Sequence, residues 1–384
     1  MIRELKIGLF LGAGASVAFG KPTTQQLRSQ LVEKYKYDDA AGTTPEQYFL
    51  FSIISFPKFE DIEHVLQCIK EVDDFFLNSQ YGGKYLLERE YKLAFQDPRR
   101  PWEFKEFTNR TKAIRKMMED DVFENYSWNH SADLALGQIC EHLLNAVRKY
   151  SKEVNIFSTN YDRAIEEYCS NQERRCRCID GFKYDEYSGR RRWTGSFSYP
   201  TEGGITNVYL YKLHGSLNWK MHKIYGIEAT SEERRSSDSN YTENLLVYPT
   251  VSPKDGQEIE PYKTIRDGFK KFMESADACI VIGFSFRDEH INTIFKDFLK
   301  RGKSIIAISP SADKNVYENL LKRTVPDPEG TVPHKKDESI VCLFRENRKV
   351  ITINQPLTLE NADKVTGLAS AAIDVLSTGE TSTK

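Results

Sequence analysis

The chain has 384 residues, of which 39% are hydrophobic and 29% are charged. This length allows one large or two modest domains, and the composition is typical of a soluble globular protein rather than a disordered one. The formal net charge of -2 gives no global attraction to nucleic acid or to a membrane surface. Any contact with nucleic acid would need a local basic patch such as Arg190 to Arg192, for which a solvated hairpin rim is the simpler interpretation.

Seven cysteines are present, which is an odd number without a regular framework. Cys279 and others lie among apolar residues, which favours buried thiols in a reducing cytoplasm over disulfides. Cys176 and Cys178 form a C-x-C pair, but no second pair lies at zinc-ribbon spacing. We therefore expect no bound metal.

The N-terminal residues 1–19 contain basic residues followed by an apolar run, as a secretion signal would. However, Glu4, Gly12 and Gly14 interrupt that pattern, and no apolar run in the sequence approaches the length of a membrane span. We expect a cytoplasmic protein without a membrane partner.

Residues 6–27 predict a short apolar strand over 7–11, then a glycine loop, then a helix. Gly12 and Gly14 would let backbone N–H groups approach a ligand, and a loop before a helix N-terminus suits a diphosphate. Thr23 and Gln26 resemble a capping box for that helix. A tight strand-to-helix turn without any ligand accounts for the same residues, so the loop alone leaves both interpretations open.

Residues 43–150 lack strong strand signals and repeat apolar residues at helical spacing, which predicts a large helical insertion. The aromatic residues in it are better interpreted as core or subunit interface than as a platform for stacking bases.

Strands and helices alternate again after residue 150, which predicts an α/β fold with a doubly wound, mostly parallel Rossmann-like sheet. The uninterrupted apolar run over 278–283 is typical of a central parallel strand covered on both faces. Residues 311–384 are expected to form a C-terminal extension that completes the fold or an oligomer interface, with edge strands within 338–353 and a helix over 359–376. Other segments with strand or helix character lie at 154–157, 163–169, 208–212, 245–249, 262–273, 290–299, 304–309 and 313–321.

Polar residues of reactive type follow several of these strands. In open α/β sheets, ligands lie beyond the carboxyl ends of the strands, so these residues would meet at one edge. Each has a plain alternative: a helix cap, a turn, or, for the histidine, a satisfied place in the core. Their conjunction favours one shared site, made of the glycine loop, Asn160, Asp162, His214, Gly283, Ser285, Arg287 and Asp288.

Two nucleotide-binding classes are disfavoured by spacing. The dinucleotide fingerprint G-x-G-x-x-G fails because Val17 occupies the place of the third glycine, and no acidic residue follows a second strand. A P-loop fails because no Gly-Lys-Ser/Thr follows the glycines.

Four motifs resemble, in their order along the chain, those of sirtuin-like domains. The resemblance runs from about residue 6 to 310, and the motifs lie at 12–23, 158–162, 212–216 and 283–288. It implies that NAD binds across the strand ends as the substrate.

The resemblance also implies roles for single residues. Asn160, His214 and Asp162 would be catalytic: His214 as general base, Asn160 as the group that positions water or ribose, and Asp162 as a hydrogen-bond partner of the carboxamide or ribose. The residues implied to contact NAD are Gly12, Ala13, Gly14, Ser16, Pro22, Thr23, Thr159, Gly283, Ser285, Phe286 and Arg287.

The sequence departs from deacetylating sirtuins, because it lacks their four-cysteine zinc module and carries the 43–150 segment between the first two motifs. It looks instead like the sirtuin-like NAD hydrolases of bacterial anti-phage defence. Resemblance to their stand-alone members implies a homo-oligomer, a HerA-like ATPase as partner, and depletion of NAD in abortive infection.

Two alternatives stay open. A sirtuin-type protein deacylase or an ADP-ribosyltransferase would share the pocket but need a peptide groove or a protein acceptor. A non-catalytic subunit that senses NAD or ADP-ribose would need the pocket alone, although Asn160 and His214 argue for chemistry at the reacting end.

Overall fold

The computed structural model describes residues 5–36, 45–59, 61–66, 68–69, 104–127, 133–151, 153–231, 240–246, 259–322, 340–345 and 348–378. The chain divides into two compact units. The first contains residues 1–23, 126–247 and 251–384, and the second contains residues 24–125 and 248–250.

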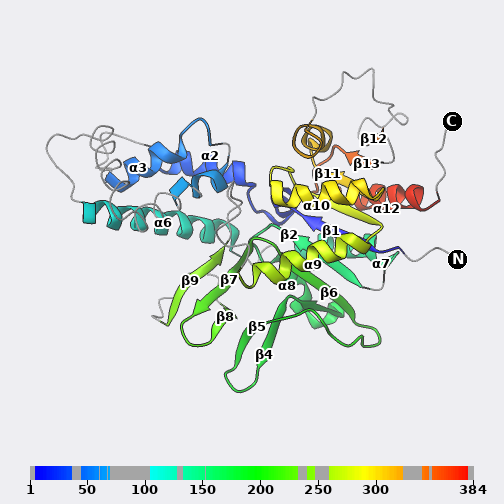
Figure 1. Ribbon diagram of the computed structural model, residues 1–384, viewed down its shortest axis with the longest axis horizontal. Helices are drawn as coiled ribbons and strands as arrows, with labels where there is room; N and C mark the ends of the chain where they lie inside the picture. The colour runs from blue at the N-terminus through cyan, green and yellow to red at the C-terminus, as the bar shows by residue number, and fades with distance from the viewer. Residues whose placement is uncertain are drawn as a thin grey trace. The chain divides into compact units, whose positions relative to one another are not determined.

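An eight-stranded sheet forms the centre of the first unit, in the order β12-β13-β11-β10-β1-β2-β6-β3 (Figure 1). All neighbours pair in parallel except β12 and β13, which are antiparallel. The predicted mostly parallel sheet is therefore confirmed. The strands are β1 (Ile7–Leu11), β2 (Val154–Ser158), β3 (Cys176–Ile179), β6 (Thr206–Lys212), β10 (Ala278–Ile282), β11 (Ser304–Ile308), β12 (Ile340–Arg345) and β13 (Arg348–Ile353).

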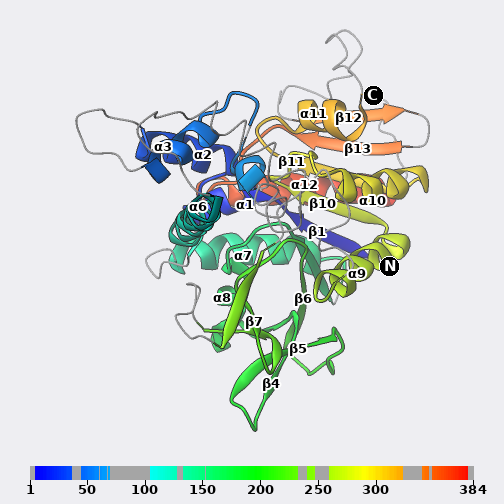
Figure 2. The same cartoon turned by 60° about the vertical axis from the view of Figure 1, so that its left-hand side comes forward.

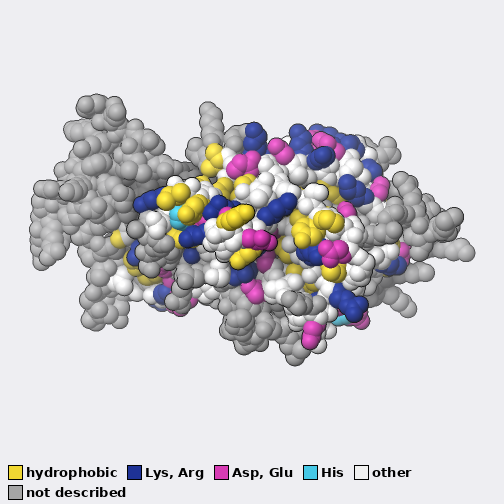
Figure 3. Space-filling model, turned by 90° about the horizontal axis from the view of Figure 1, so that it is seen from below, with side chains coloured by type: hydrophobic (Ala, Val, Ile, Leu, Met, Phe, Trp, Pro, Cys, Tyr) yellow, Lys and Arg dark blue, Asp and Glu magenta, His cyan; other side chains and the backbone are white. Residues whose placement is uncertain are grey.

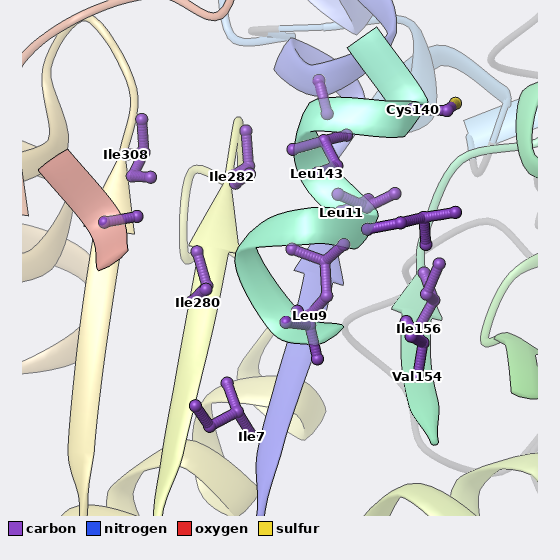
Figure 4. Packing of buried hydrophobic residues seen from close by; sticks show 14 of the residues in the cluster. Ile7, Leu9, Leu11, Cys140, Leu143, Val154, Ile156, Ile280, Ile282 and Ile308 are labelled. Carbon is purple, nitrogen blue, oxygen red and sulfur yellow. The ribbon is translucent and has the colours of Figure 1, made fainter. Parts of the chain in front are cut away.

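Both faces of this sheet are covered, as the doubly wound prediction requires. Strand β1 is buried along its whole length: Ile7, Leu9 and Leu11 belong to one apolar cluster, and Phe10 belongs to the other. Leu143 of α7 packs with the first cluster (Figure 4), and α7 and α9 flank β1 in the view of Figure 2. Helices α7 (Asp133–Arg148), α8 (Ala164–Ser170) and α12 (Ala362–Thr378) contribute to the first cluster, and α9 (Tyr262–Ser275), α10 (Glu289–Lys300) and α11 (Ala312–Asn315) to the second.

The C-terminal strands differ from the expectation in one respect. The sequence predicts both at the sheet edge, but β13 pairs with β11 on one side and β12 on the other. Of these two strands, β12 lies at the edge and β13 does not, because the antiparallel hairpin adds β12 outside a strand that already continues the parallel ladder.

A second, antiparallel sheet of five strands, in the order β4-β5-β8-β7-β9, belongs to the same unit. Phe182, Trp193 and Trp219 pack against one another on it, with ring centroids 5.0–6.4 Å apart. From the sequence, residues 173–210 are expected to form hairpins or loops; β4 and β5 form one antiparallel hairpin there, whereas β3 and the start of β6 belong to the parallel sheet. The strands of the five-stranded sheet are β4 (Gly181–Asp185), β5 (Arg190–Ser196), β7 (Gly215–His222), β8 (Gly226–Ala229) and β9 (Tyr241–Leu246).

The second unit is helical in the residues described. Arg28 Nε donates to the Ile54 carbonyl at 2.9 Å, which ties α2 to α3. Tyr35 donates its hydroxyl to Asp121 Oδ2 of α6 at 2.6 Å. The helices are α2 (Thr24–Lys34), α3 (Pro45–Ile54) and α6 (Phe104–Tyr126).

Short helical turns join the main elements. They are α1 (Ala13–Ser16), the 3₁₀ turns η1 (Val17–Phe19) and η3 (Gln172–Arg174), and the π-helical η4 (Val316–Leu320). On the face shown in Figure 3, Lys and Arg side chains are interspersed with Asp and Glu side chains. Among the described helices, none is both long and apolar enough to cross a membrane.

The loops that follow β1 and β10 are in backbone contact with each other. Gly12 N–H donates to the Ile282 carbonyl, and Gly14 N–H to the Gly283 carbonyl, each at 2.9 Å. Gly283 has a φ of 65°, and a Cβ there would lie 2.2 Å from the Ala15 nitrogen. A Cβ on Gly12 would lie 2.6 Å from the Gly283 oxygen. These glycines are therefore required for the packing of one loop against the other, whether or not a ligand binds.

We expect Gly283→Ala to destabilise the fold by about 3 kcal/mol. Alanine is strained at this left-handed φ, and its Cβ would also collide with the backbone of Gly14 and Ala15. Gly226→Ala is the matched control, since its φ is 75° but no atom lies within 4 Å of the added Cβ. That control should lose only about 1 kcal/mol. Urea denaturation of both variants measures the difference, and equal losses would show that the contact between the loops is not tight.

Candidate functional site

Four strand ends meet at one edge of the parallel sheet. Backbone bonds continue the ladder one residue past the strands: Thr159 N–H donates to the Leu11 carbonyl at 3.0 Å, and Leu213 N–H to the Ser158 carbonyl at 2.8 Å. Because Ser158 of β2 pairs with Lys212 of β6, Asn160 and His214 each lie two residues past paired positions on adjacent strands. The structure therefore brings the second and third predicted motifs side by side.

Ser16, Asn160 and Asp162 form a hydrogen-bonded cluster. The buried Ser16 hydroxyl donates to Asp162 Oδ2 at 2.5 Å and accepts from Asn160 Nδ2 at 2.8 Å. Asn160 Nδ2 also donates to the Gly12 carbonyl at 3.0 Å, and Asp162 Oδ1 accepts from the Ala164 N–H at the start of α8. Both carboxylate oxygens of Asp162 thus have protein partners, and Ser16 joins the glycine loop to the second motif.

His214 pairs with Asp288. The two side chains are 6% and 7% exposed, and His214 Nε2 lies 3.0 Å from Asp288 Oδ2. Asp288 Oδ1 accepts from the N–H groups of His290 and Ile291, so the same carboxylate caps α10. Since the carboxylate can only accept, this network assigns the proton to Nε2 in the neutral imidazole and leaves Nδ1 as the basic nitrogen.

The pKa of Asp288 lies below its ordinary value. Burial by itself raises that pKa, but the hydrogen bond from His214, the charge of its imidazolium form and the N–H of Ile291 outweigh burial. The carboxylate is therefore stabilised in its charged form beside the histidine.

A buried lysine fixes the turn that carries Asn160 and Asp162. Lys212 Nζ donates to the carbonyls of Tyr161 and Asp162 and to Ser216 Oγ, and it lies 3.3 Å from Glu166 Oε1. Burial raises the pKa of Glu166, although Lys212 opposes that rise. Lys212 is thus satisfied by carbonyl and hydroxyl oxygens, as a buried ammonium requires.

Two buried polar atoms of the site have no hydrogen-bond partner in the described part of the chain. They are Asn160 Oδ1, an acceptor, and His214 Nδ1. Buried polar groups in native proteins are almost always paired, so such atoms at a strand edge indicate a place for polar ligand groups. Their position fits a ligand that carries hydroxyl groups.

The other residues predicted to contact the ligand differ in how far they are buried. Phe286 is buried against Phe284 and Phe295, so only its backbone could meet a ligand, whereas Arg287 is exposed. Gly14, Ser285, Pro22 and Thr23 are half-buried. In the glycine loop, the N–H groups of Gly12, Gly14 and Ala15 donate to backbone carbonyls, whereas the Ala13 N–H has no backbone acceptor within the described residues.

For two residues of the site, the sequence does not predict the contacts that the structure shows. It indicates Asp288 as a cap but not as the partner of His214, and Lys212 only as part of a motif. The backbone requires glycine at position 215, next to the histidine: its φ is 87° and a Cβ would lie 2.2 Å from the Leu245 carbonyl oxygen. No sequence signal links residues 214 and 288, because their contact depends on how β6 and β10 are placed in the sheet.

Within the described residues, no group of three or more His, Cys, Asp or Glu side chains is arranged to hold a metal ion.

Comparisons with known proteins bear on this geometry. Residues 154–324 match the family model of the SIR2-like domain, and this range contains Asn160, Asp162, His214 and Asp288. The match supports the sirtuin-like resemblance of the motifs. Comparison with curated proteins finds no match.

Solved structures of Sir2 homologues are similar at low identity. A mutant Sir2 homologue in complex with ADP-ribose is 15% identical, with a TM-score of 0.41, over 97% of this chain and 96% of that chain. A complex of a Sir2 homologue with NAD is 13% identical, with a TM-score of 0.39, over 96% of this chain and 90% of that chain.

We expect Asp288→Asn to change how stability depends on pH. Because the folded-state pKa of Asp288 is below its ordinary value of 3.8, the carboxylate adds stability above that pH, and this is lost as the pH falls through the folded-state pKa. Asparagine can still cap α10, so the substitution removes mainly the charge. The difference in free energy of unfolding between wild type and variant should therefore shrink from about pH 5.5 to about pH 3.

Urea denaturation at both pH values measures this difference. Asp297→Asn, at an exposed position of the same helix, is the control and should show no such trend. A wild-type advantage that persists at the lower pH would contradict the assigned charge interaction.

Proposed function

We propose that the chain is an NAD glycohydrolase that cleaves NAD to nicotinamide and ADP-ribose. The observation that carries the proposal is the buried His214–Asp288 pair, in which His214 Nδ1 has no hydrogen-bond partner within the described residues; His214 and Asn160 follow adjacent strands. The SIR2-like match over residues 154–324 supports NAD as the substrate, since these residues fall within it.

Binding of NAD across the strand ends would use both sides of the edge. The Ala13 N–H and the other residues of the glycine loop, Gly12 to Ser16, would bind the diphosphate, with Pro22 and Thr23 nearby. Gly283, Ser285 and the backbone of Phe286 would hold the adenosine side, with Arg287 at the rim. Thr159, Asn160 and His214 would lie at the nicotinamide ribose.

Cleavage of the glycosidic bond of NAD requires groups of the kind that Asn160, His214 and Asp288 would supply. As the glycosidic bond breaks, nicotinamide leaves as a neutral molecule and the ribose gains oxocarbenium character, so the enzyme must hold the ribose and a nucleophile in place. His214 Nδ1 would accept a proton from the attacking water or from a ribose hydroxyl, and Asp288 would stabilise the resulting imidazolium. Asn160 Oδ1 would accept a hydrogen bond from the same O–H. Water adds to the ribose, and one proton is released to solvent.

Asp162 would act mainly as a positioning residue. Its two oxygens hold Ser16 and the start of α8, and Ser16 in turn holds Asn160. A direct contact between Asp162 and the carboxamide or ribose of NAD stays a prediction.

The resemblance to stand-alone NAD hydrolases of anti-phage defence extends the proposal. In that setting the chain would be a cytoplasmic homo-oligomer that works with a HerA-like ATPase and depletes NAD in abortive infection. Activity of the isolated chain is then expected to be low until the partner or a trigger is present.

The direct test is incubation of the purified protein with NAD, with and without a HerA-like ATPase, while nicotinamide release is followed by chromatography. His214→Ala and Asn160→Ala should each lower turnover by at least about 100-fold, which is typical of losing a general base or its positioning group. His142→Ala removes a half-buried histidine outside the site and should leave turnover unchanged.

Other outcomes would select other functions. Full turnover in the two site variants would overturn the assigned roles. NAD loss only with an acyl-lysine peptide would favour a deacylase, and ADP-ribose attached to protein would favour a transferase. Tight NAD binding without cleavage, even with the partner, would favour a sensing subunit.

A further inference from the structure

A pocket lies in the first unit, and none of the residues proposed to contact NAD lines it. Its volume is about 810 Å³, within the range of pockets that hold small-molecule ligands. Helix α8, strand β3, strand β5 and the loop before β6 supply its walls.

The pocket wall is rich in arginine. Four arginines line it against two carboxylates, Glu166 and Asp180. Arginine presents a planar fork of donors that matches the oxygens of phosphate and carboxylate groups. The arginines are Arg163, Arg175, Arg177 and Arg191.

Some of these donors are already engaged. Arg191 Nη2 donates to both oxygens of Asp180 at 2.7 and 2.9 Å, and Arg163 pairs with Glu167 at 2.8 Å. Arg177 differs, because Nη2 donates to Glu202 at 2.9 Å while its Nη1 is buried without a hydrogen-bond partner in the described residues. One strong donor on the wall is therefore unsatisfied, which indicates a missing acceptor.

Arg175 adds a second available cation. It is exposed at the pocket, and no ion pair to it is found in the described part of the chain. Its φ is 48°, which arginine rarely adopts. Strained backbone of this kind is concentrated at ligand clamps and other functional positions.

Two titratable groups on the wall, Cys176 and Glu166, have shifted pKa values. The pKa of Cys176 is lowered, chiefly because the Cys169 thiol hydrogen-bonds to it; burial opposes this, and Arg148 and Arg174 lower it further. Burial also raises the pKa of Glu166, which reduces the negative charge on the wall. The shift of Glu166 favours an anion in the pocket, whereas the lowered pKa of Cys176 adds negative charge and does not.

We propose that this pocket is a binding site for a small molecule that carries a phosphate or diphosphate group, held by Arg175 and Arg177. The charge, the unsatisfied Arg177 donor and the volume together favour such a ligand over an apolar one. The proposal does not rest on NAD cleavage, because none of the residues proposed to contact NAD lines this pocket; Glu166, the partner of Lys212, is the residue that links the two places.

Isothermal titration of the whole protein with inorganic pyrophosphate tests this proposal. The double variant Arg175→Gln with Arg177→Gln should bind pyrophosphate at least roughly tenfold more weakly than wild type. Arg177→Lys, which keeps the charge but loses the fork, should bind with intermediate affinity. Thermal melting confirms that each variant is folded.

Two controls distinguish binding in this pocket from binding elsewhere on the protein. Lys183→Gln with Lys223→Gln removes the same charge from exposed positions of the five-stranded sheet and should leave the affinity unchanged. Ser16→Ala changes only the proposed diphosphate site of the candidate site, so it should leave the arginine-dependent part of the binding unchanged. The proposal is overturned if the arginine variant binds like wild type, if the lysine variant loses binding equally, or if only Ser16→Ala loses it.

Discussion

Backbone contact between the loops after β1 and β10 is the constraint on which the candidate site depends. Gly12, Gly14 and Gly283 allow two chain segments to approach at distances that a Cβ would forbid. This contact fixes Ser16 beside the ends of β2, and Ser16 then holds Asn160 and Asp162. A glycine motif that suggests phosphate binding therefore also has a purely structural reason to be glycine.

Buried polar groups define the rest of the edge. Lys212, Asp162, His214 and Asp288 are removed from water, which costs free energy unless each finds a partner. Carbonyls, a hydroxyl and helix N–H groups provide most of those partners. The atoms that remain unsatisfied, Asn160 Oδ1 and His214 Nδ1, are the ones that the proposed reaction uses. Structure and chemistry thus agree on where a ligand would complete the network.

The candidate site and the arginine pocket present different chemical groups to a ligand. The candidate site presents an acceptor and a base at the strand edge, which suits hydroxyl groups and proton transfer. The arginine pocket presents fixed cations, which suits a stable anion. Glu166 lines the arginine pocket and also lies near Lys212, which supports the Asn160–Asp162 turn. The Glu166 carboxylate of the arginine pocket therefore lies close to Lys212, the lysine that holds the turn of the candidate site.

Much of this fold was determined by the sequence alone. The apolar runs at β1, β10 and β11 predict buried parallel strands, and the polar residues after strands predict one shared edge, because periodicity and strand-end chemistry are local properties. The partner of His214, 74 residues away, and the partner of Ser16, 146 residues away, were decided only by the tertiary structure. So were the interior position of β13 and the burial of Phe286. These features depend on strand order and register, which bring together residues that are far apart in the sequence. The local sequence around one of them contains no information about the other.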